Sequence, residues 1–280
     1  MRTVSVLDVT EAVKSACIEM NYIIDTRVKT CFENALLTEA SPIGVAIIED
    51  LIENSKVASE YVAPLCQDTG MVVAFVKIGQ EIRIENGLLS DAIQEGVRQG
   101  YQEGYLRKSV VSDPLLRKNT TDNTPCIIYY DVVAGEVFEI ELATKGFGSE
   151  NMSKSKMLKP SDGVEGVVSF VIETVIQAGS NPCPPIIVGI GIGGTLDKAA
   201  QIAKHALLRP LGDESELEHI AALEKRILSE INKTGIGPQG LGGSTTAIAV
   251  HIETFPTHIA GLPVVVNINC HSSRHKKVVL

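Results

Sequence analysis

The chain has 280 residues, a formal net charge of −9 and no tryptophan, and is long enough for one large domain or two modest ones. Its acidity, and the lack of a basic run interleaved with aromatic residues, argue against a nucleic-acid-binding protein. Its start is too polar for a secretory signal, and no apolar run approaches the roughly 20 residues of a membrane span. We therefore expect a soluble cytoplasmic protein that binds neither nucleic acid nor membrane.

The first quarter of the chain predicts helices, and a strand follows it. Apolar residues recur at helical spacing over Leu7–Met20 and Thr26–Leu37. Ser41-Pro42 is a typical start for a third helix, which we expect to run to about Ser55. Met71–Ile78 is a short apolar run bounded by breakers, which predicts a buried strand.

The rest of the chain alternates between strand and helix patterns. Leu88–Leu106 predicts a helix, whereas Cys126–Val133 and Val137–Thr144 predict two strands joined by a tight turn into a β-hairpin. Helices are also predicted at Val164–Gln177, from Leu196 and at Glu216–Lys233. Strands are predicted at Ile186–Ile190, Thr245–Ile252 and Val264–Ile268. This order predicts a mixed α/β (α+β) fold in which one domain covers residues 1–280. Its helical part, residues 1–60, would pack on a mixed sheet flanked by helices.

A glycine-rich stretch follows the predicted strand Ile186–Ile190, and Thr195 behind it is a candidate helix cap. A strand, a glycine loop and a helix N-terminus together can bind an anion. Gly189, Gly191 and Gly194 also match the dinucleotide motif G-x-G-x-x-G. That motif needs a second parallel strand ending in an acid about 20 residues on, and a helix pattern stands there instead. NAD binding is therefore rejected, and a phosphate- or nucleotide-binding module remains a rival hypothesis.

The six cysteines fall into two groups. With no C-x-x-C pair, they predict no disulfide framework in a reducing cytosol. Cys17, Cys31 and Cys126 lie on apolar helix faces or in a strand, as buried thiols do. The others lie at strand ends or in loops flanked by Pro, Gly or Asn: Cys66, Cys183 and Cys270. Three such thiolates predict a zinc ion or an iron–sulfur cluster, and a cluster would leave one iron open as a Lewis acid.

Several motifs in order carry a family resemblance. They are Cys66-Gln67-Asp68-Thr69-Gly70, the Lys145-Gly-x-Gly-Ser149 loop, Asn181-Pro-Cys-Pro-Pro185 with GIGIGG behind it, and Pro256-Thr-His258 before Asn269-Cys270-His271. On these residues nearly the whole chain resembles the α subunit, or N-terminal half, of the class I iron–sulfur fumarases and L-tartrate dehydratases.

The resemblance implies a site for a small dicarboxylate. Cys66, Cys183 and Cys270 would each ligate one iron of a 4Fe–4S cluster, whose fourth iron holds the substrate hydroxyl and a carboxylate oxygen. Asp68 and His258 would handle protons near that hydroxyl. The implied contacts to the substrate carboxylates are Gln67, Asp68, Arg107 and the Gly148 amide. A helix-capping role is the alternative for Arg107, and Lys145 is a weaker candidate cation.

The resemblance also implies a partner. Family members built as one chain carry a further domain, which supplies the remaining substrate cations and the group that removes the C3 proton. This sequence stops shortly after Cys270, with Arg274 in a tail that the pattern does not place. We therefore expect a separate β subunit in a homo- or hetero-oligomer that reversibly hydrates fumarate to L-malate. Dehydration of L(+)-tartrate is the alternative, and a zinc-binding structural subunit is a rival from another class.

Overall fold

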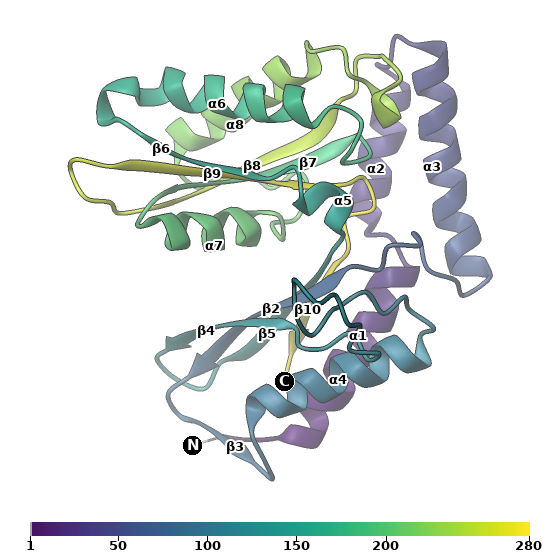
Figure 1. The fold of residues 1–280 in the computed structure, drawn as a ribbon, viewed down its shortest axis with the longest axis vertical. Helices are drawn as coiled ribbons and strands as arrows, with labels where there is room; N and C mark the ends of the chain where they lie inside the picture. The colour runs from purple at the N-terminus through teal and green to yellow at the C-terminus, as the bar shows by residue number, and fades with distance from the viewer. Residues whose placement is uncertain (1) are drawn as a thin grey trace. The chain divides into compact units, whose positions relative to one another are not determined.

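The computed structural model describes residues 2–280 and has a mixed α/β architecture, which confirms the predicted fold class (Figure 1). It forms two compact units. Unit 1 comprises Met1–Ile24, Ser55–Phe147 and Arg274–Leu280, and unit 2 comprises Asp25–Asn54 and Gly148–Ser273. Neither unit is continuous in sequence, which explains why the sequence shows no domain boundary. That the two units act as a single domain stays a prediction.

Unit 1 is built on a four-stranded sheet with the order β10-β5-β2-β4 and a parallel two-stranded sheet, β1-β3. Buried side chains of α1 and α4, among them Val13, Cys17 and Tyr101, form one core with the larger sheet. The elements of unit 1 are β1 (Arg2–Ser5), α1 (Val6–Tyr22), β2 (Met71–Gly79), β3 (Ile82–Glu85), α4 (Leu89–Glu103), β4 (Ile127–Val133), β5 (Phe138–Lys145) and β10 (His275–Val279).

The predicted hairpin between β4 and β5 is wrong, because β2 lies between these strands, parallel to β4 and antiparallel to β5. The connection from β4 to β5 wraps around the end of β2. There the Gln80 N–H donates to the Val133 carbonyl at 2.8 Å, and the Gly79 N–H donates to the Val137 carbonyl at 2.7 Å. A Cβ on Gly79 would lie 2.0 Å from the Gly135 carbonyl oxygen, so this close approach requires glycine.

Unit 2 contains a four-stranded sheet with the order β6-β9-β7-β8. Helices α6 and α8 cover one face of this sheet and α7 covers the other (Figure 1). The helices predicted in the first quarter are confirmed, and α3 runs beyond the expected end to Glu60. The elements are α2 (Thr26–Leu36), α3 (Pro42–Glu60, continuing into unit 1), α5 (Phe147–Glu150), β6 (Lys154–Leu158), η1 (Pro160–Asp162), α6 (Gly163–Ala178), β7 (Ile186–Gly193), α7 (Leu196–Ala206), α8 (Glu218–Asn232), η2 (Pro238–Gly240), β8 (Ala247–Phe255) and β9 (Leu262–Asn269).

Most of the glycine-rich stretch belongs to strand β7 rather than to a ligand-binding loop. β7 continues to Gly193 and pairs with β8 on one side and β9 on the other. A Cβ on Gly191 would lie 2.0 Å from the carbonyl oxygen of Ala199 in α7. Glycine at this position therefore lets α7 lie directly against the strand. This packing role explains the glycine without a ligand, so the phosphate- or nucleotide-binding hypothesis loses its main support.

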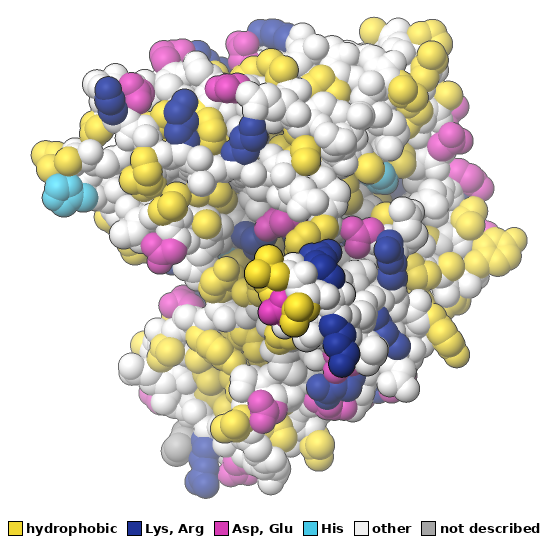
Figure 2. Space-filling view, viewed as in Figure 1, with side chains coloured by type: hydrophobic (Ala, Val, Ile, Leu, Met, Phe, Trp, Pro, Cys, Tyr) yellow, Lys and Arg dark blue, Asp and Glu magenta, His cyan; other side chains and the backbone are white. Residues whose placement is uncertain are grey.

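The surface carries charges of both signs. On the face in Figure 2, Asp and Glu side chains lie among Lys and Arg side chains. Such mixing limits the field that any one group of charges projects into solvent. Among residues 2–280, no helix is both long enough and apolar enough to cross a membrane.

Candidate active site

Several of the predicted site residues meet at one end of the four-stranded sheet of unit 1. The Cys66–Gly70 loop leads directly into β2, whose first residue, Met71, is paired with Lys145 at the end of β5. Arg274 directly precedes β10, which pairs with β5 at the same end. The sheet therefore brings the motif around Cys66 beside Lys145 and Arg274.

The Asp68 carboxylate is held by backbone N–H groups. Its Oδ2 accepts the N–H of Phe147 at 2.9 Å, and its Oδ1 accepts the N–H of Gly70 at 3.1 Å. Asp68 and Cys66 are half-buried, whereas Gln67 between them is exposed. A carboxylate fixed in position and open on one side is suited to accept or deliver a proton.

Arg107 is attached to the same loop through its backbone. The Thr69 hydroxyl donates to the Arg107 carbonyl at 2.9 Å, and the Tyr101 hydroxyl donates to the Thr69 carbonyl at 2.6 Å. Burial raises the pKa of Tyr101 well above its usual range, so this group keeps the proton that it donates.

The helix before Arg107 is shorter than predicted and does not reach it. α4 ends at Glu103, and Tyr105 then takes a left-handed conformation with φ 49°. Arg107 is exposed and lies beyond the last turn, which contains no basic residue. The helix-capping alternative is therefore not supported, and the guanidinium is accessible to a carboxylate.

Asn123 connects the segment that follows Arg107 in the sequence to the Cys66–Gly70 loop. Its Oδ1 accepts the N–H groups of Ser109 at 2.7 Å and Val110 at 3.2 Å, and its Nδ2 donates to the Gly70 carbonyl at 3.1 Å. The side chain is fully buried, and the backbone has φ 63°, a region that asparagine tolerates better than most residues. The sequence alone does not single out Asn123, because the stretch around it has only the composition of a polar loop.

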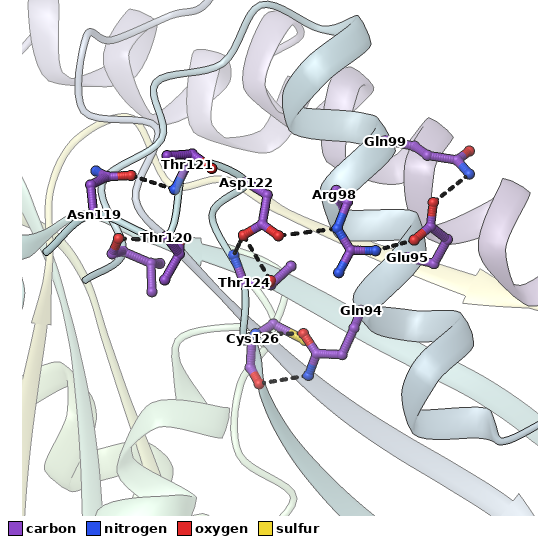
Figure 3. A network of polar contacts seen from close by, with 11 residues as sticks. Gln94, Glu95, Arg98, Gln99, Asn119, Thr120, Thr121, Asp122, Thr124 and Cys126 are labelled. Atoms are coloured by element: carbon purple, nitrogen blue, oxygen red, sulfur yellow. Dashed lines mark hydrogen bonds and ion pairs between the residues drawn. The ribbon is translucent and has the colours of Figure 1, made fainter. Parts of the chain in front are cut away.

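A polar network holds the residues around Asn123 against α4 (Figure 3). Arg98 Nε of α4 donates to Asp122 Oδ2 at 3.1 Å, and Arg98 also pairs with Glu95. Asp122 Oδ1 accepts both the N–H of Thr124 at 3.0 Å and its hydroxyl at 2.8 Å. The network fixes both neighbours of Asn123 and thereby the direction of its amide.

We expect Asp122→Asn to destabilise the protein in a pH-dependent way. Partial burial opposes ionisation, but the bonds from Thr124 and Arg98 outweigh it and lower the pKa of Asp122 from 3.8 to about 2. A lowered pKa contributes stability that is fully present above about pH 4 and is lost as the pH falls toward about 2. The substitution should lower the free energy of unfolding by on the order of 2 kcal/mol near neutral pH, and by less in acid.

Urea unfolding across this pH range measures the effect. Asp131→Asn is the matched control, because Asp131 is exposed on β4 and loses the same charge. An equal loss in the two variants, or a loss from Asp122→Asn that does not shrink in acid, would contradict the expectation.

Two buried cations lie near the Asp68 carboxylate. Arg274 is 3% exposed and donates from Nη1 to Asn21 Oδ1 at 3.1 Å, and Lys145 is 4% exposed and donates from Nζ to the Gly146 carbonyl at 3.3 Å. A Cβ placed on Gly146 would lie 3.2 Å from Asp68 Oδ2 and 3.6 Å from Arg274 Nη2. The sequence could not place Arg274, because its position depends on the long-range pairing of β10.

In unit 2 the structure brings two of the three predicted ligands to one end of the sheet. Cys183 precedes β7 and Cys270 follows β9, and these strands are antiparallel neighbours with Ile187 paired to Asn269. His271 Nδ1 lies 3.0 Å from the Cys183 carbonyl oxygen. Because that oxygen only accepts, we assign the proton to Nδ1, and this bond joins the two cysteine segments.

Gly148 and His258 occupy different places in unit 2. Gly148 is exposed, and a Cβ on it would lie 3.5 Å from the Asn181 carbonyl, so it neighbours the turn that carries Cys183. His258 lies in the exposed connection from β8 to β9, where its Nδ1 accepts the Ala260 N–H at 3.2 Å. That connection lies at the opposite end of the sheet from Cys183 and Cys270. An eight-residue strand separates the two ends by roughly 25 Å. Within unit 2, His258 therefore does not approach the cysteines, and its pairing with Asp68 stays a prediction.

The thiols separate into the same two groups as in the sequence. None of the six cysteines forms a disulfide; Cys183 is exposed, and both Cys66 and Cys270 are half-buried. Burial raises the pKa of Cys126 to about 12, and it also raises that of Cys17 and Cys31. Metal ligation needs a thiolate, so the donor chemistry favours the three predicted ligands over the others. Among residues 2–280, no group of three or more His, Cys, Asp or Glu side chains is arranged to hold a metal ion.

Known proteins resemble this chain over most of its length. The family model described as fumarate hydratase (Fumerase) matches residues 10–279. A Methanocaldococcus jannaschii protein, provisionally named L(+)-tartrate dehydratase subunit alpha, is 47% identical over 253 residues, which are 88% of each chain. The L(+)-tartrate dehydratase subunit alpha of Escherichia coli strain UTI89 is 35% identical over 239 residues, which are 84% of this chain and 78% of its own. This chain therefore belongs to the fumarate hydratase (Fumerase) family.

Proposed function

We propose that this chain is the α-type subunit of an iron–sulfur hydro-lyase that reversibly removes water from a small 2-hydroxy dicarboxylate. Family membership makes the chain a hydro-lyase. The observation that carries the proposed site is the meeting of the Cys183 and Cys270 segments at one end of the unit 2 sheet. Fumarate and L-malate are the first candidate pair, from the family description. L(+)-tartrate is the second, because the relatives carry its name.

The proposed cofactor is a 4Fe–4S cluster, for which Cys66, Cys183 and Cys270 would supply the thiolates. When bound, the cluster would offer an iron without a thiolate, which polarises the hydroxyl that leaves the substrate. The residues fit this group because all three thiols are at least partly exposed and lie at strand ends or in turns. A zinc ion is the rival occupant, and an iron assay distinguishes the two metals.

The remaining site residues would bind the substrate and handle its protons. Asp68 would hold the proton that is exchanged with the hydroxyl, from a position fixed by two backbone N–H groups. The exposed Arg107 guanidinium suits bidentate pairing with one substrate carboxylate. Gln67 and the Gly148 N–H would donate hydrogen bonds to carboxylate oxygens. The resemblance alone gives His258 its proton-handling role.

A separate β subunit is the proposed partner. The relatives named above are described as alpha subunits, which supports a second type of chain in the enzyme. The absence of disulfides among the six cysteines suits a reducing compartment such as the cytoplasm, where an iron–sulfur cluster would persist.

Replacing the proton-handling carboxylate tests the proposal. In the enzyme assembled anaerobically with its β subunit, we expect Asp68→Asn to lower kcat by about 10²–10⁴-fold while the iron content stays at the wild-type level. The assay follows malate-to-fumarate and L-tartrate-to-oxaloacetate conversion, and the faster reaction identifies the substrate. Asp131→Asn serves as the charge-matched control on the exposed side of β4. Wild-type turnover in Asp68→Asn would refute the assignment of Asp68.

A further inference from the structure

We propose that Gln239, in the glycine-rich loop Gly235–Gly243, is a positioning residue that holds the turn carrying Cys183 in the geometry needed for ligation. This inference rests on the proposed function, because it assigns Gln239 a role toward a group that Cys183 would bind. It gives a function to a loop that the hydro-lyase chemistry leaves unexplained.

The contacts of Gln239 converge on the turn between Cys183 and β7. Its backbone N–H and its side-chain Nε2 both donate to the Pro184 carbonyl, at 2.8 Å and 2.9 Å. Nε2 also lies 3.3 Å from His271 Nδ1, the atom that donates to the Cys183 carbonyl at 3.0 Å, and because both nitrogens carry hydrogen this is a packing contact rather than a hydrogen bond. One side chain therefore touches both the Cys183 turn and the residue that follows Cys270.

The backbone of Gln239 is in a conformation that favours glycine. It has φ 52° and ψ 14°, the left-handed region, which is unfavourable for a residue with a Cβ atom. Glycine occupies several other positions of this loop, with positive φ at Gly237 and Gly240. Strained backbone conformations persist only where the surrounding contacts hold them, and they cluster at functional sites. The strain at Gln239 therefore points to a functional role for its side chain.

The loop has other anchors that do not involve the Gln239 side chain. The Glu39 carboxylate accepts the N–H groups of Ser244 and Thr245, both at 2.8 Å. The Gly237 N–H donates to the Thr246 hydroxyl at 3.1 Å. Because these bonds hold the loop at both of its ends, loss of the Gln239 amide should leave the fold intact and affect mainly the Cys183 turn.

Two substitutions separate the strain from the side chain. Gln239→Gly relieves the left-handed strain and removes the Nε2 contact, whereas Gln239→Glu keeps the shape and places a carboxylate oxygen against the Pro184 carbonyl. Arg117→Gly is the matched control, because Arg117 is exposed and also has positive φ, at 60°. The full-length chain is loaded anaerobically with iron and sulfide, and iron release to a chelator is timed.

We expect both Gln239 variants to release iron about tenfold faster than wild type, a typical cost of losing an outer-shell contact at a metal site. The thermal midpoint of the iron-free chain should be unchanged or raised in Gln239→Gly. Hydrogen exchange in residues 180–186 of the iron-free chain should be faster in both variants. Arg117→Gly should match wild type in iron release and in exchange.

The readouts distinguish the two proposals. Wild-type iron release together with wild-type exchange in the Gln239 variants would overturn the role of Gln239. A wild-type chain that binds no iron would overturn the proposed cofactor, and the exchange measurement would still decide whether Gln239 holds the turn.

Discussion

Replacement of Cys183 by Ser is expected to deplete the anaerobically purified chain of iron and sulfide by at least tenfold. A serine hydroxyl does not ionise near neutral pH, so it cannot replace a thiolate, and two remaining thiolates hold a cluster poorly. Cys66→Ser and Cys270→Ser should give the same result. Iron and sulfide per chain, together with the broad visible absorbance of thiolate-bound iron, measure it.

The other three cysteines provide the controls. Cys31→Ser and Cys126→Ala should keep wild-type iron, because burial raises the pKa of both thiols and leaves them protonated. Cys17→Ala should do likewise, with a loss of stability from its fully buried site. Full iron in Cys183→Ser would refute the ligand assignment. Equal depletion in Cys126→Ala would show that the loss reports unfolding rather than ligation.

Local patterns predicted the elements of the fold better than their pairing. Helices such as α1 and α2 have an apolar face at helical spacing, and their predicted bounds differ from the structure by at most two residues. Strand order depends on contacts far apart in sequence, which explains the wrong hairpin between β4 and β5. The short strands β1 and β10 were missed, because each is defined by its partner rather than by its own apolar pattern.

The residues of the candidate site also differ in how far the sequence predicts them. Cys66, Asp68 and Cys183 stand in motifs that can be recognised from their neighbours in sequence, and the structure places them at sheet ends. Asn123 and Gln239 lie in loops whose composition predicts only turns, and their contacts to Gly70 and Pro184 appear only after folding. Sequence patterns therefore indicate which residues carry chemistry more readily than which residues hold them in place.

The chain alone is expected to be inactive and to become a hydro-lyase when it is combined with its β subunit. The substrate carries two carboxylates and develops negative charge at C3 as its proton leaves. Arg107 is exposed and can pair with one carboxylate. Arg274 and Lys145 are buried and donate hydrogen bonds to Asn21 Oδ1 and to the Gly146 carbonyl, so both are engaged within unit 1. The second carboxylate and the developing charge then need cations from another chain.

Stabilisation of charge in the transition state is usually the largest catalytic contribution, and the loss of a single donor typically costs about 10²–10³-fold in kcat. The chain without β should therefore turn over malate and L-tartrate at least about 10²-fold more slowly than the assembled enzyme. Both preparations are loaded with iron under the same anaerobic conditions and assayed at equal cluster content. Cys183→Ser combined with β is the control, since it should be inactive if the activity depends on the cluster of this chain. Turnover by the chain alone at the rate of the mixture would refute the division of the site between two subunits, because the groups that bind the second carboxylate would then lie in this chain.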